Sequence, residues 1–312
     1  MASVPDLLAA GLGPGRVRCD VPLAPFTTFR VGGPADYLVE ARDAADLAAV
    51  VAVAARAGMP VTVLGGGSNV LVSDAGIRGV VVRVHGGAIG PEGDGRVRAD
   101  AGATLNALVR WTIGRGLAGL EAWAGTPGTV GGAIFGNAHY QGRSIGDAVR
   151  SVRLVGEGGS IEDVPSGAME FAYDRSRLHR TGEIVLSVLF ALTPGQDPAV
   201  LRETARRSLA ERKRTQPLDV PSAGCVFQNP DPAVDPVPEG IPASAGALVD
   251  RAGLKGCAIG GARVSPVHAN FIVNEGGAGA ADIRRLIDRC RDEVLARFGV
   301  TLREEIRYLG EW

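Results

Sequence analysis

A run of glycines placed directly after a buried strand constrains this chain more than any other feature. Residues 60–64 read PVTVL, an apolar and β-branched segment that predicts a strand, and Gly65-Gly66-Gly67-Ser68-Asn69 follows it without a break. Consecutive backbone N–H groups with little side-chain bulk form a concave turn that can hold a diphosphate. The spacing fits neither GxGxxG nor GxxxxGKS/T, so it predicts neither a Rossmann loop nor a P-loop, and alone it is more typical of a flexible turn.

A second glycine-rich segment follows about sixty residues later and favours a ligand for both. Residues 125–133 read GTPGTVGGA and again allow the backbone to approach a bound molecule closely. Two such loops suit a long dinucleotide such as FAD. The candidate cofactor-binding residues are Gly65, Gly66, Gly67, Ser68, Asn69, Gly125, Thr126, Gly128, Gly131 and Gly132.

Composition and charge exclude several classes of protein. The chain has 312 residues, 46% hydrophobic and 21% charged, with a formal net charge of -1, which is typical of a globular protein and not of a nucleic-acid protein built on bulk basicity. No run of about 18 uncharged apolar residues occurs and no basic segment precedes the first apolar stretch, so we expect a cytoplasmic protein without a membrane partner. The four cysteines show no CxxC spacing, so neither a metal site nor a disulfide framework is predicted.

The length predicts two domains, and Pro194-Gly195 marks the boundary that we expect between them. Residues 1–195 are rich in short apolar strands, whereas residues 196–312 contain the longer helical patterns, so the fold class is α+β. Asp43 and Thr104 are placed to cap helices, and Cys290 falls on the apolar face of the last one. The expected strands are 35–41, 60–64, 70–72, 80–84, 96–99, 151–155, 160–164 and 183–192, and the expected long helices are 198–214 and 281–298.

Seven short motifs in a fixed order give the chain a specific resemblance. They are 28–35 (TFRVGGPA), 64–71 (LGGGSNVL), 125–133 (GTPGTVGGA), 223–230 (AGCVFQNP), 253–256 (GLKG), 268–274 (HANFIVN) and 305–307 (EIR). Together they resemble the UDP-N-acetylenolpyruvoylglucosamine reductase family, over nearly the whole chain. The resemblance implies an FAD-binding domain of the vanillyl-alcohol-oxidase (PCMH) type in residues 1–195. It also implies a smaller α+β substrate domain in 196–312, whose last segment returns to the active site.

The resemblance also implies a reaction. NADPH would reduce a non-covalently bound FAD and leave, and hydride would then pass to the enolpyruvyl ether of UDP-N-acetylglucosamine enolpyruvate. The product, UDP-N-acetylmuramate, belongs to peptidoglycan precursor synthesis. We expect a small-molecule substrate, no nucleic-acid partner, and a monomer or a weak homo-oligomer. No extended insertion with an extra tyrosine loop lies between Tyr173 and Lys213, so the chain resembles the compact branch of the family.

Three catalytic roles are carried over from the family, two of them onto changed residues. The usual proton donor is a serine in an AGSxFxNP motif, and Cys225 stands there. A thiol of ordinary pKa, about 8.5, is mostly protonated at pH 7 and can donate a proton. Glu305 matches the family's catalytic glutamate, with Glu304 as the alternative if the register slips by one.

The family's catalytic arginine lies in a YRxS motif, but this chain reads Tyr173-Asp174-Arg175-Ser176. An anionic side chain cannot stabilise a developing enolate, so we assign the role to Arg175, with Arg177 as the alternative. On a strand a one-residue displacement would turn the side chain to the other face, whereas on a turn it would not.

The substrate-binding candidates are Lys213, Arg214 and Asn229. The two basic residues are plausible partners for the substrate diphosphate, although a solvated basic helix end is an equal alternative. His268 is more typical of a structural histidine.

Two other functions fit the same fold. A flavin-dependent oxidase would usually be longer and often tethers its flavin through a histidine or cysteine, and neither residue occurs between Leu64 and Val84. A catalytically inactive nucleotide-binding protein is the second alternative, and Asp174 favours it.

Overall fold

The structure is a computed structural model that describes residues 8, 13 and 15–312, and its contacts divide the chain into two compact units. Unit 1 consists of the described residues up to Val21 with Ala35–Gly66 and Arg78–Glu211, and unit 2 of Pro22–Pro34, Gly67–Ile77 and Arg212–Trp312. Unit 2 therefore takes two segments from the first 195 residues. The predicted functional boundary after Gly195 stays a prediction, because these units are defined by contacts alone.

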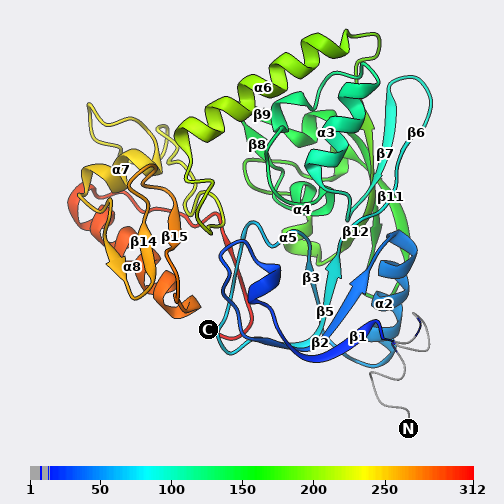
Figure 1. The fold of residues 1–312 in the computed structure, drawn as a ribbon, viewed down its shortest axis with the longest axis horizontal. Coiled ribbons are helices and arrows are strands. Elements are labelled where there is room, and N and C mark those ends of the chain that lie inside the picture. The colour runs from blue at the N-terminus through cyan, green and yellow to red at the C-terminus, as the bar shows by residue number, and fades with distance from the viewer. Residues whose placement is uncertain (1–7, 9–12, 14) are drawn as a thin grey trace. The chain divides into compact units, whose positions relative to one another are not determined.

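Unit 1 is built on two sheets that enclose one apolar core (Figure 1). The first sheet has the order β1-β2-β5-β3, with strands Val17–Pro22, Pro34–Ala41, Ile77–Val84 and Val61–Leu64. The second is antiparallel in the order β11-β10-β12-β7-β6, with strands Ile161–Pro165, Val149–Val155, Ile184–Ala191, Arg96–Asp100 and Ile89–Pro91. Trp123 and Phe190 are among the largest side chains buried in this core.

The helices of unit 1 begin at the polar residues that the sequence offers as caps. The Asp43 side chain accepts a hydrogen bond from the Asp46 N–H at the start of α2, and Thr104 accepts from Ala107 at the start of α3. Thr129 caps α4 in the same way. These helices span Ala44–Arg56 (α2), Leu105–Gly114 (α3) and Val130–Phe135 (α4), and a short hairpin of His139–Tyr140 (β8) and Arg143–Ser144 (β9) follows α4. The short helix Leu178–Thr181 (α5) is also in unit 1, whereas Pro198–Thr215 (α6) begins in unit 1 and its residues from Arg212 onward belong to unit 2.

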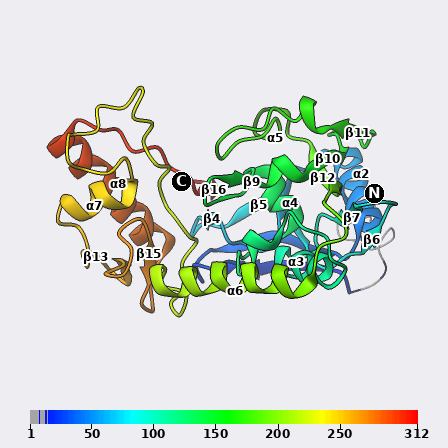
Figure 2. The ribbon, with the colours of Figure 1, turned by 90° about the horizontal axis from the view of Figure 1, so that it is seen from above.

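Unit 2 packs one long amphipathic helix against small strands (Figure 2). Ala280–Phe298 (α8) contacts Ala245–Arg251 (α7) and the sheet of Ala258–Ile259 (β13), Ala262–Val264 (β14) and Ile272–Asn274 (β15). A separate parallel pair joins Val70–Val72 (β4) to Arg307–Leu309 (β16). Cys290 is 1% exposed within the core, which confirms its predicted position, and burial raises the pKa of its thiol to about 12.

The predicted long elements are confirmed with small differences at their ends. The expected strand at 70–72 is confirmed as β4 of unit 2, whereas the sequence did not indicate β1, β6, β13, β14 or β16. None of the helices in the part of the chain that the structure describes is long and apolar enough to cross a membrane.

Candidate active site

The two glycine-rich loops meet within unit 1. A Cβ atom added to Gly66 would lie 2.8 Å from the Cα atom of Gly128, and one added to Gly65 would lie 2.5 Å from Oγ1 of Thr129. Gly125 and Gly128 have φ angles of 81° and 108°, which favour glycine. The structure thus brings together Gly65 and Gly66 of the first loop with the second loop, and both contacts require the missing side chain.

The end of the first loop is held by main-chain contacts in unit 2. Gly67 has a φ of 61°, and a Cβ there would lie 2.2 Å from the Phe26 carbonyl oxygen. The Asn69 side chain donates to the Glu305 carbonyl at 3.2 Å, while the Arg307 N–H donates to the Asn69 carbonyl at 3.0 Å. Asn69 therefore links the first glycine loop to the segment that carries the predicted catalytic glutamate.

The segments of Cys225 and Glu305 are paired in unit 2. The Glu305 N–H donates to the Val226 carbonyl at 2.8 Å, and an isolated bridge joins Phe227 to Glu304. Cys225 is half-buried, and its main chain forms a second bridge with Phe271. The structure thus brings the predicted proton donor and the predicted glutamate into neighbouring positions of two paired segments.

Glu304, the alternative to Glu305, is held in an ion pair. Its Oε1 accepts from Arg291 Nη1 at 2.9 Å, and Arg291 lies on α8. This contact directs the Glu304 side chain toward the helix. We therefore keep Glu305 as the candidate.

The Tyr173-Asp174-Arg175 segment is a tight turn rather than a strand. Ala172 and Arg175 exchange main-chain hydrogen bonds of 2.9 and 3.2 Å, and Asp174 has a φ of 51°. Asp174 is 7% exposed, and its Oδ1 lies 3.0 Å from Nδ1 of His139. Arg175 is exposed. The turn therefore buries the acidic residue and presents the arginine outward.

Arg177, the alternative to Arg175, is engaged by a carboxylate. It donates from Nε and Nη2 to Glu183 at 2.8 and 2.6 Å. This bidentate pair holds the pKa of the Glu183 carboxyl below its ordinary value. Because this pairing engages the Arg177 guanidinium, we keep Arg175 as the candidate.

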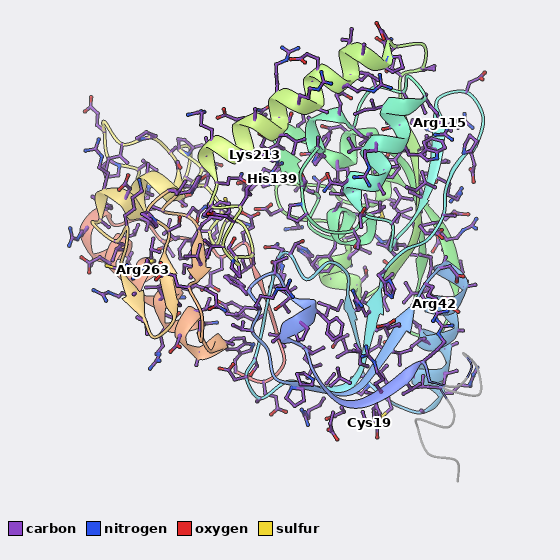
Figure 3. All side chains as sticks on the ribbon, viewed as in Figure 1. Cys19, Arg42, Arg115, His139, Lys213 and Arg263 are labelled. Atoms are coloured by element: carbon purple, nitrogen blue, oxygen red, sulfur yellow. The ribbon has the colours of Figure 1, made fainter. Side chains whose placement is uncertain are left out.

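The predicted substrate-binding residues lie in unit 2 on different segments. Lys213 and Arg214 are exposed in the last turn of α6, where Figure 3 labels Lys213. Asn229 accepts from the Ala245 N–H at 3.1 Å and so caps the start of α7. His268 Nδ1 accepts from the Asn270 N–H at 3.2 Å, and burial lowers its pKa, as suits a neutral structural histidine.

Sequence reasoning missed two residues that contact segments carrying predicted site residues, one in each unit. His139 lies 35 positions before its partner Asp174, and Asn270 contacts the segment that carries Cys225. The HANFIVN motif contains Asn270, which was a usable signal, whereas the His139 pairing has no local pattern. Among the described residues, no group of three or more histidine, cysteine or acidic side chains could hold a metal ion.

Comparison with known proteins assigns the family. Residues 35–164 match the family "FAD binding domain", and residues 216–309 match "UDP-N-acetylenolpyruvoylglucosamine reductase, C-terminal domain". Two curated relatives named as this reductase are each 42% identical to the chain. The one from Symbiobacterium thermophilum aligns over 95% of this chain and 93% of its own length, and the one from Heliobacterium modesticaldum over 93% and 90%.

A solved structure agrees with these relatives over nearly the same span. The reductase from Thermus caldophilus has a TM-score of 0.76 and 34% sequence identity, and the match covers 94% of this chain and 99% of that one. These findings confirm the predicted α+β fold with an FAD-binding domain. The chain belongs to the UDP-N-acetylenolpyruvoylglucosamine reductase family.

Proposed function

We propose that this chain uses NADPH and FAD to reduce UDP-N-acetylglucosamine enolpyruvate to UDP-N-acetylmuramate. Relatives about 40% identical over nearly the whole chain are named for the reduction of this enolpyruvyl compound. The observation that carries the proposal is the main-chain pairing of the segments that carry Cys225 and Glu305, the residues to which we assign proton donation and its relay. A cytoplasmic enzyme fits a nucleotide-sugar substrate.

The glycine loops fit a bound dinucleotide. Gly65 and Gly66 pack so closely against the second loop that a Cβ atom at either position would clash with Thr129 or Gly128. Main-chain N–H groups of glycine turns such as these two can bind a diphosphate. Gly65, Gly66 and Gly128, with Gly125, Thr126, Gly131 and Gly132, would hold FAD, assisted by Gly67, Ser68 and Asn69. When bound, FAD supplies the chemistry of accepting a hydride from NADPH and delivering it to the enol ether.

Cys225 completes the reduction by supplying a proton. Hydride addition to the terminal carbon leaves negative charge on the adjacent carbon and its carboxylate, and that carbon must be protonated. The Cys225 S–H bond breaks as the new C–H bond forms, leaving a thiolate that solvent reprotonates. We assign the orientation or relay of this proton to Glu305, whose N–H is bonded to the carbonyl of the residue after Cys225.

Arg175 supplies the positive charge that the developing enolate requires. Its guanidinium makes no ion pair with another residue of 15–312, whereas Arg177 is paired with Glu183. An exposed guanidinium can bind a carboxylate in bidentate fashion and stabilise charge that appears in the transition state. Lys213 and Arg214 are assigned to the substrate diphosphate, and Asn229 to its sugar or flanking groups.

An anaerobic experiment tests the reaction. The yellow protein is reduced with one equivalent of NADPH, the enolpyruvyl substrate is added, and flavin absorbance is followed. Reoxidation supports the proposal. A flavin that stays reduced until air enters would contradict it, and would favour an oxidase or an inactive nucleotide-binding protein.

Variants of Cys225 test the proton donor within the same assay. Cys225→Ala should leave reduction by NADPH intact and slow the substrate half-reaction by at least about 100-fold, because general acid catalysis contributes roughly that much. Cys225→Ser should retain much of the rate, since a hydroxyl can also donate a proton. Equal loss in both half-reactions for Cys225→Ala would make the cysteine structural.

A further inference from the structure

The segment that carries Cys225 is irregular, yet a buried side chain fixes it. Between 223 and 229 the chain forms only isolated bridges, at Cys225 and Phe227, and no strand. A proton donor must be placed accurately, because a displacement of about 1 Å can cost about 100-fold in rate. Some other contact must therefore supply the order that a strand would give.

Asn270 supplies that contact through three hydrogen bonds. Its Nδ2 donates to the Phe227 carbonyl at 2.7 Å, and its Oδ1 accepts from the Phe227 N–H at 2.9 Å. Its own carbonyl accepts from the Val226 N–H at 2.8 Å. Asn270 is 3% exposed, and Val226 and Phe227 are 1% and 2% exposed, so water cannot replace these bonds.

Only a carboxamide satisfies both polar groups of Phe227. An aspartate could accept from the Phe227 N–H but would set a negative oxygen against the carbonyl, and an alanine would leave both groups buried and unpaired. The Asn270 N–H is itself bonded to His268 Nδ1, which fixes the backbone from which the amide extends.

The same contacts reach Glu305. The Val226 N–H is bonded to Asn270, and the Val226 carbonyl accepts from the Glu305 N–H. The main chain of Val226 thus lies between Asn270 and the catalytic glutamate, immediately after Cys225. Loss of the side-chain amide would remove two of the three bonds from Asn270 and leave only the main-chain bond to Val226 to hold this register.

We propose that Asn270 is a positioning residue for proton transfer, which holds the Cys225 thiol and Glu305 in register through the main chain of Val226 and Phe227. It touches neither substrate nor cofactor in this role. The proposal rests on the proposed function, because the step it serves is the protonation assigned to Cys225.

The test compares Asn270→Ala and Asn270→Asp with Asn274→Ala. Asn274 is a matched control, since it is also buried (7% exposed), ends the strand β15 that begins two residues after Asn270, and donates from Nδ2 to the Phe29 carbonyl at 2.9 Å. For each variant we would measure both half-reactions, the saturation constant for the substrate, the unfolding midpoint, and the rate of Cys225 alkylation by iodoacetamide, read on its own peptide by mass spectrometry.

The expected results distinguish a role of Asn270 in positioning Cys225 from a role in the stability of the fold. Both Asn270 variants should slow the substrate half-reaction by about 10- to 100-fold at saturating substrate, change its saturation constant little, and leave reduction by NADPH intact. Cys225 alkylation should change by several-fold, while exposed Cys19 reacts as before. Asn274→Ala should lower the unfolding midpoint with the substrate half-reaction within about twofold.

Two results would overturn the proposal in distinguishable ways. Asn270 variants with wild-type substrate half-reactions and unchanged Cys225 alkylation would show that the amide positions nothing. Wild-type protein that never reoxidises with substrate would instead refute the proposed function. Asn270→Asp keeps the shape of the side chain and carries the test if Asn270→Ala does not fold.

Discussion

In the turn at 172–175, Asp174 stands where the family motif has an arginine, and Arg175 follows one residue later. Asp174 is buried against His139, and its positive φ is one that aspartate tolerates better than most residues. The ring centroids of His139 and Tyr173 lie 4.5 Å apart, which adds a packing contact to the polar contact between His139 and Asp174. The Asp174 carboxylate is therefore buried, whereas the neighbouring Arg175 is exposed.

Replacement of Arg175 by alanine should therefore slow the substrate half-reaction by about 100-fold, corresponding to about 3 kcal/mol of transition-state stabilisation. Arg177→Ala is the control: it breaks the pair with Glu183 and should lower the unfolding midpoint while leaving that rate nearly unchanged. Single-turnover absorbance and thermal unfolding measure the two effects. A normal rate for Arg175→Ala with a collapse for Arg177→Ala would reassign the role.

The sequence could indicate candidate residues, but it could not predict which individual side chains pair with each other. The motif placed Cys225 and Glu305 in candidate roles, because each stands in a recognisable short pattern. Asp174 could be identified as a departure, but nothing local indicated that a histidine 35 positions away would pair with it. Such contacts depend on which turns the folded core brings together.

Elements with enough residues to show a period could be predicted, whereas most of the shortest could not, β4 at Val70–Val72 being an exception. Helix α8 has 19 residues and a clear apolar face, whereas β13, β14 and β15 have two or three residues each. Their pairing is fixed by packing against α8, which no local pattern encodes. The glycine loops could be located, but their contact with each other came only from the structure.

That contact predicts different results for two glycine substitutions. Gly66→Ala should lower both the unfolding midpoint and the fraction of protein that retains FAD, because its Cβ would lie 2.8 Å from backbone that cannot move cheaply. Gly114→Ala should be neutral or stabilise the protein by about 0.5–1 kcal/mol, since its position is helical and open. Flavin absorbance per protein and thermal unfolding test both, and full flavin content in Gly66→Ala would contradict the assignment of the loop.

Over the whole molecule, the compact units depend on pairings between distant parts of the sequence. β4 pairs with β16, and Asn69 contacts a residue 236 positions away. Composition and a proline-glycine signal could suggest two domains. They could not show that 22–34 and 67–77 would join the C-terminal unit, because that choice is made by long-range contacts.

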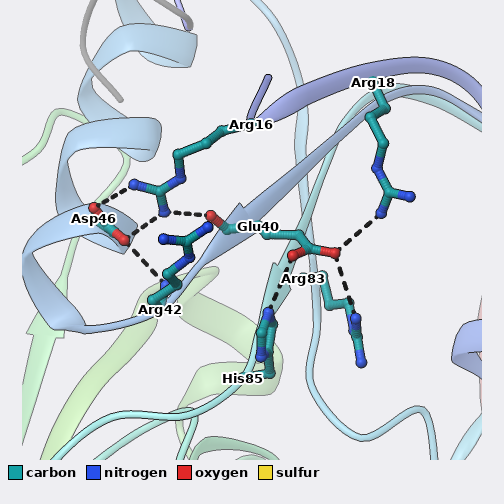
Figure 4. Close-up of polar contacts among 7 residues, drawn as sticks. All are labelled: Arg16, Arg18, Glu40, Arg42, Asp46, Arg83 and His85. Atoms are coloured by element: carbon teal, nitrogen blue, oxygen red, sulfur yellow. Dashed lines mark hydrogen bonds and ion pairs between the residues drawn. The ribbon is translucent and has the colours of Figure 1, made fainter. Parts of the chain in front are cut away.

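Ion pairs within each of the two units predict how the stability of the protein depends on pH. Figure 4 shows Asp46 bonded to Arg16, and Glu40 beside Arg18, Arg83 and His85. Arginine hydrogen bonds hold the pKa values of Asp46, Glu183 and Asp235 below their ordinary range, through Arg16, Arg177 and Arg303 respectively. Burial opposes ionisation of Glu40, but its cationic neighbours still lower its pKa.

The folded state therefore binds fewer protons than the unfolded state in mildly acidic solution. The free energy of unfolding must decrease there as the pH is lowered. We expect an unfolding midpoint that is nearly constant above about pH 5.5 and declines below about pH 4.5, as the unfolded carboxyls take up protons first. Added salt should shrink the decline, because the exposed pairs are screened. Glu183→Gln should reduce the slope between about pH 5 and pH 3. A midpoint that does not change over that interval would show that these pairs contribute nothing to folding.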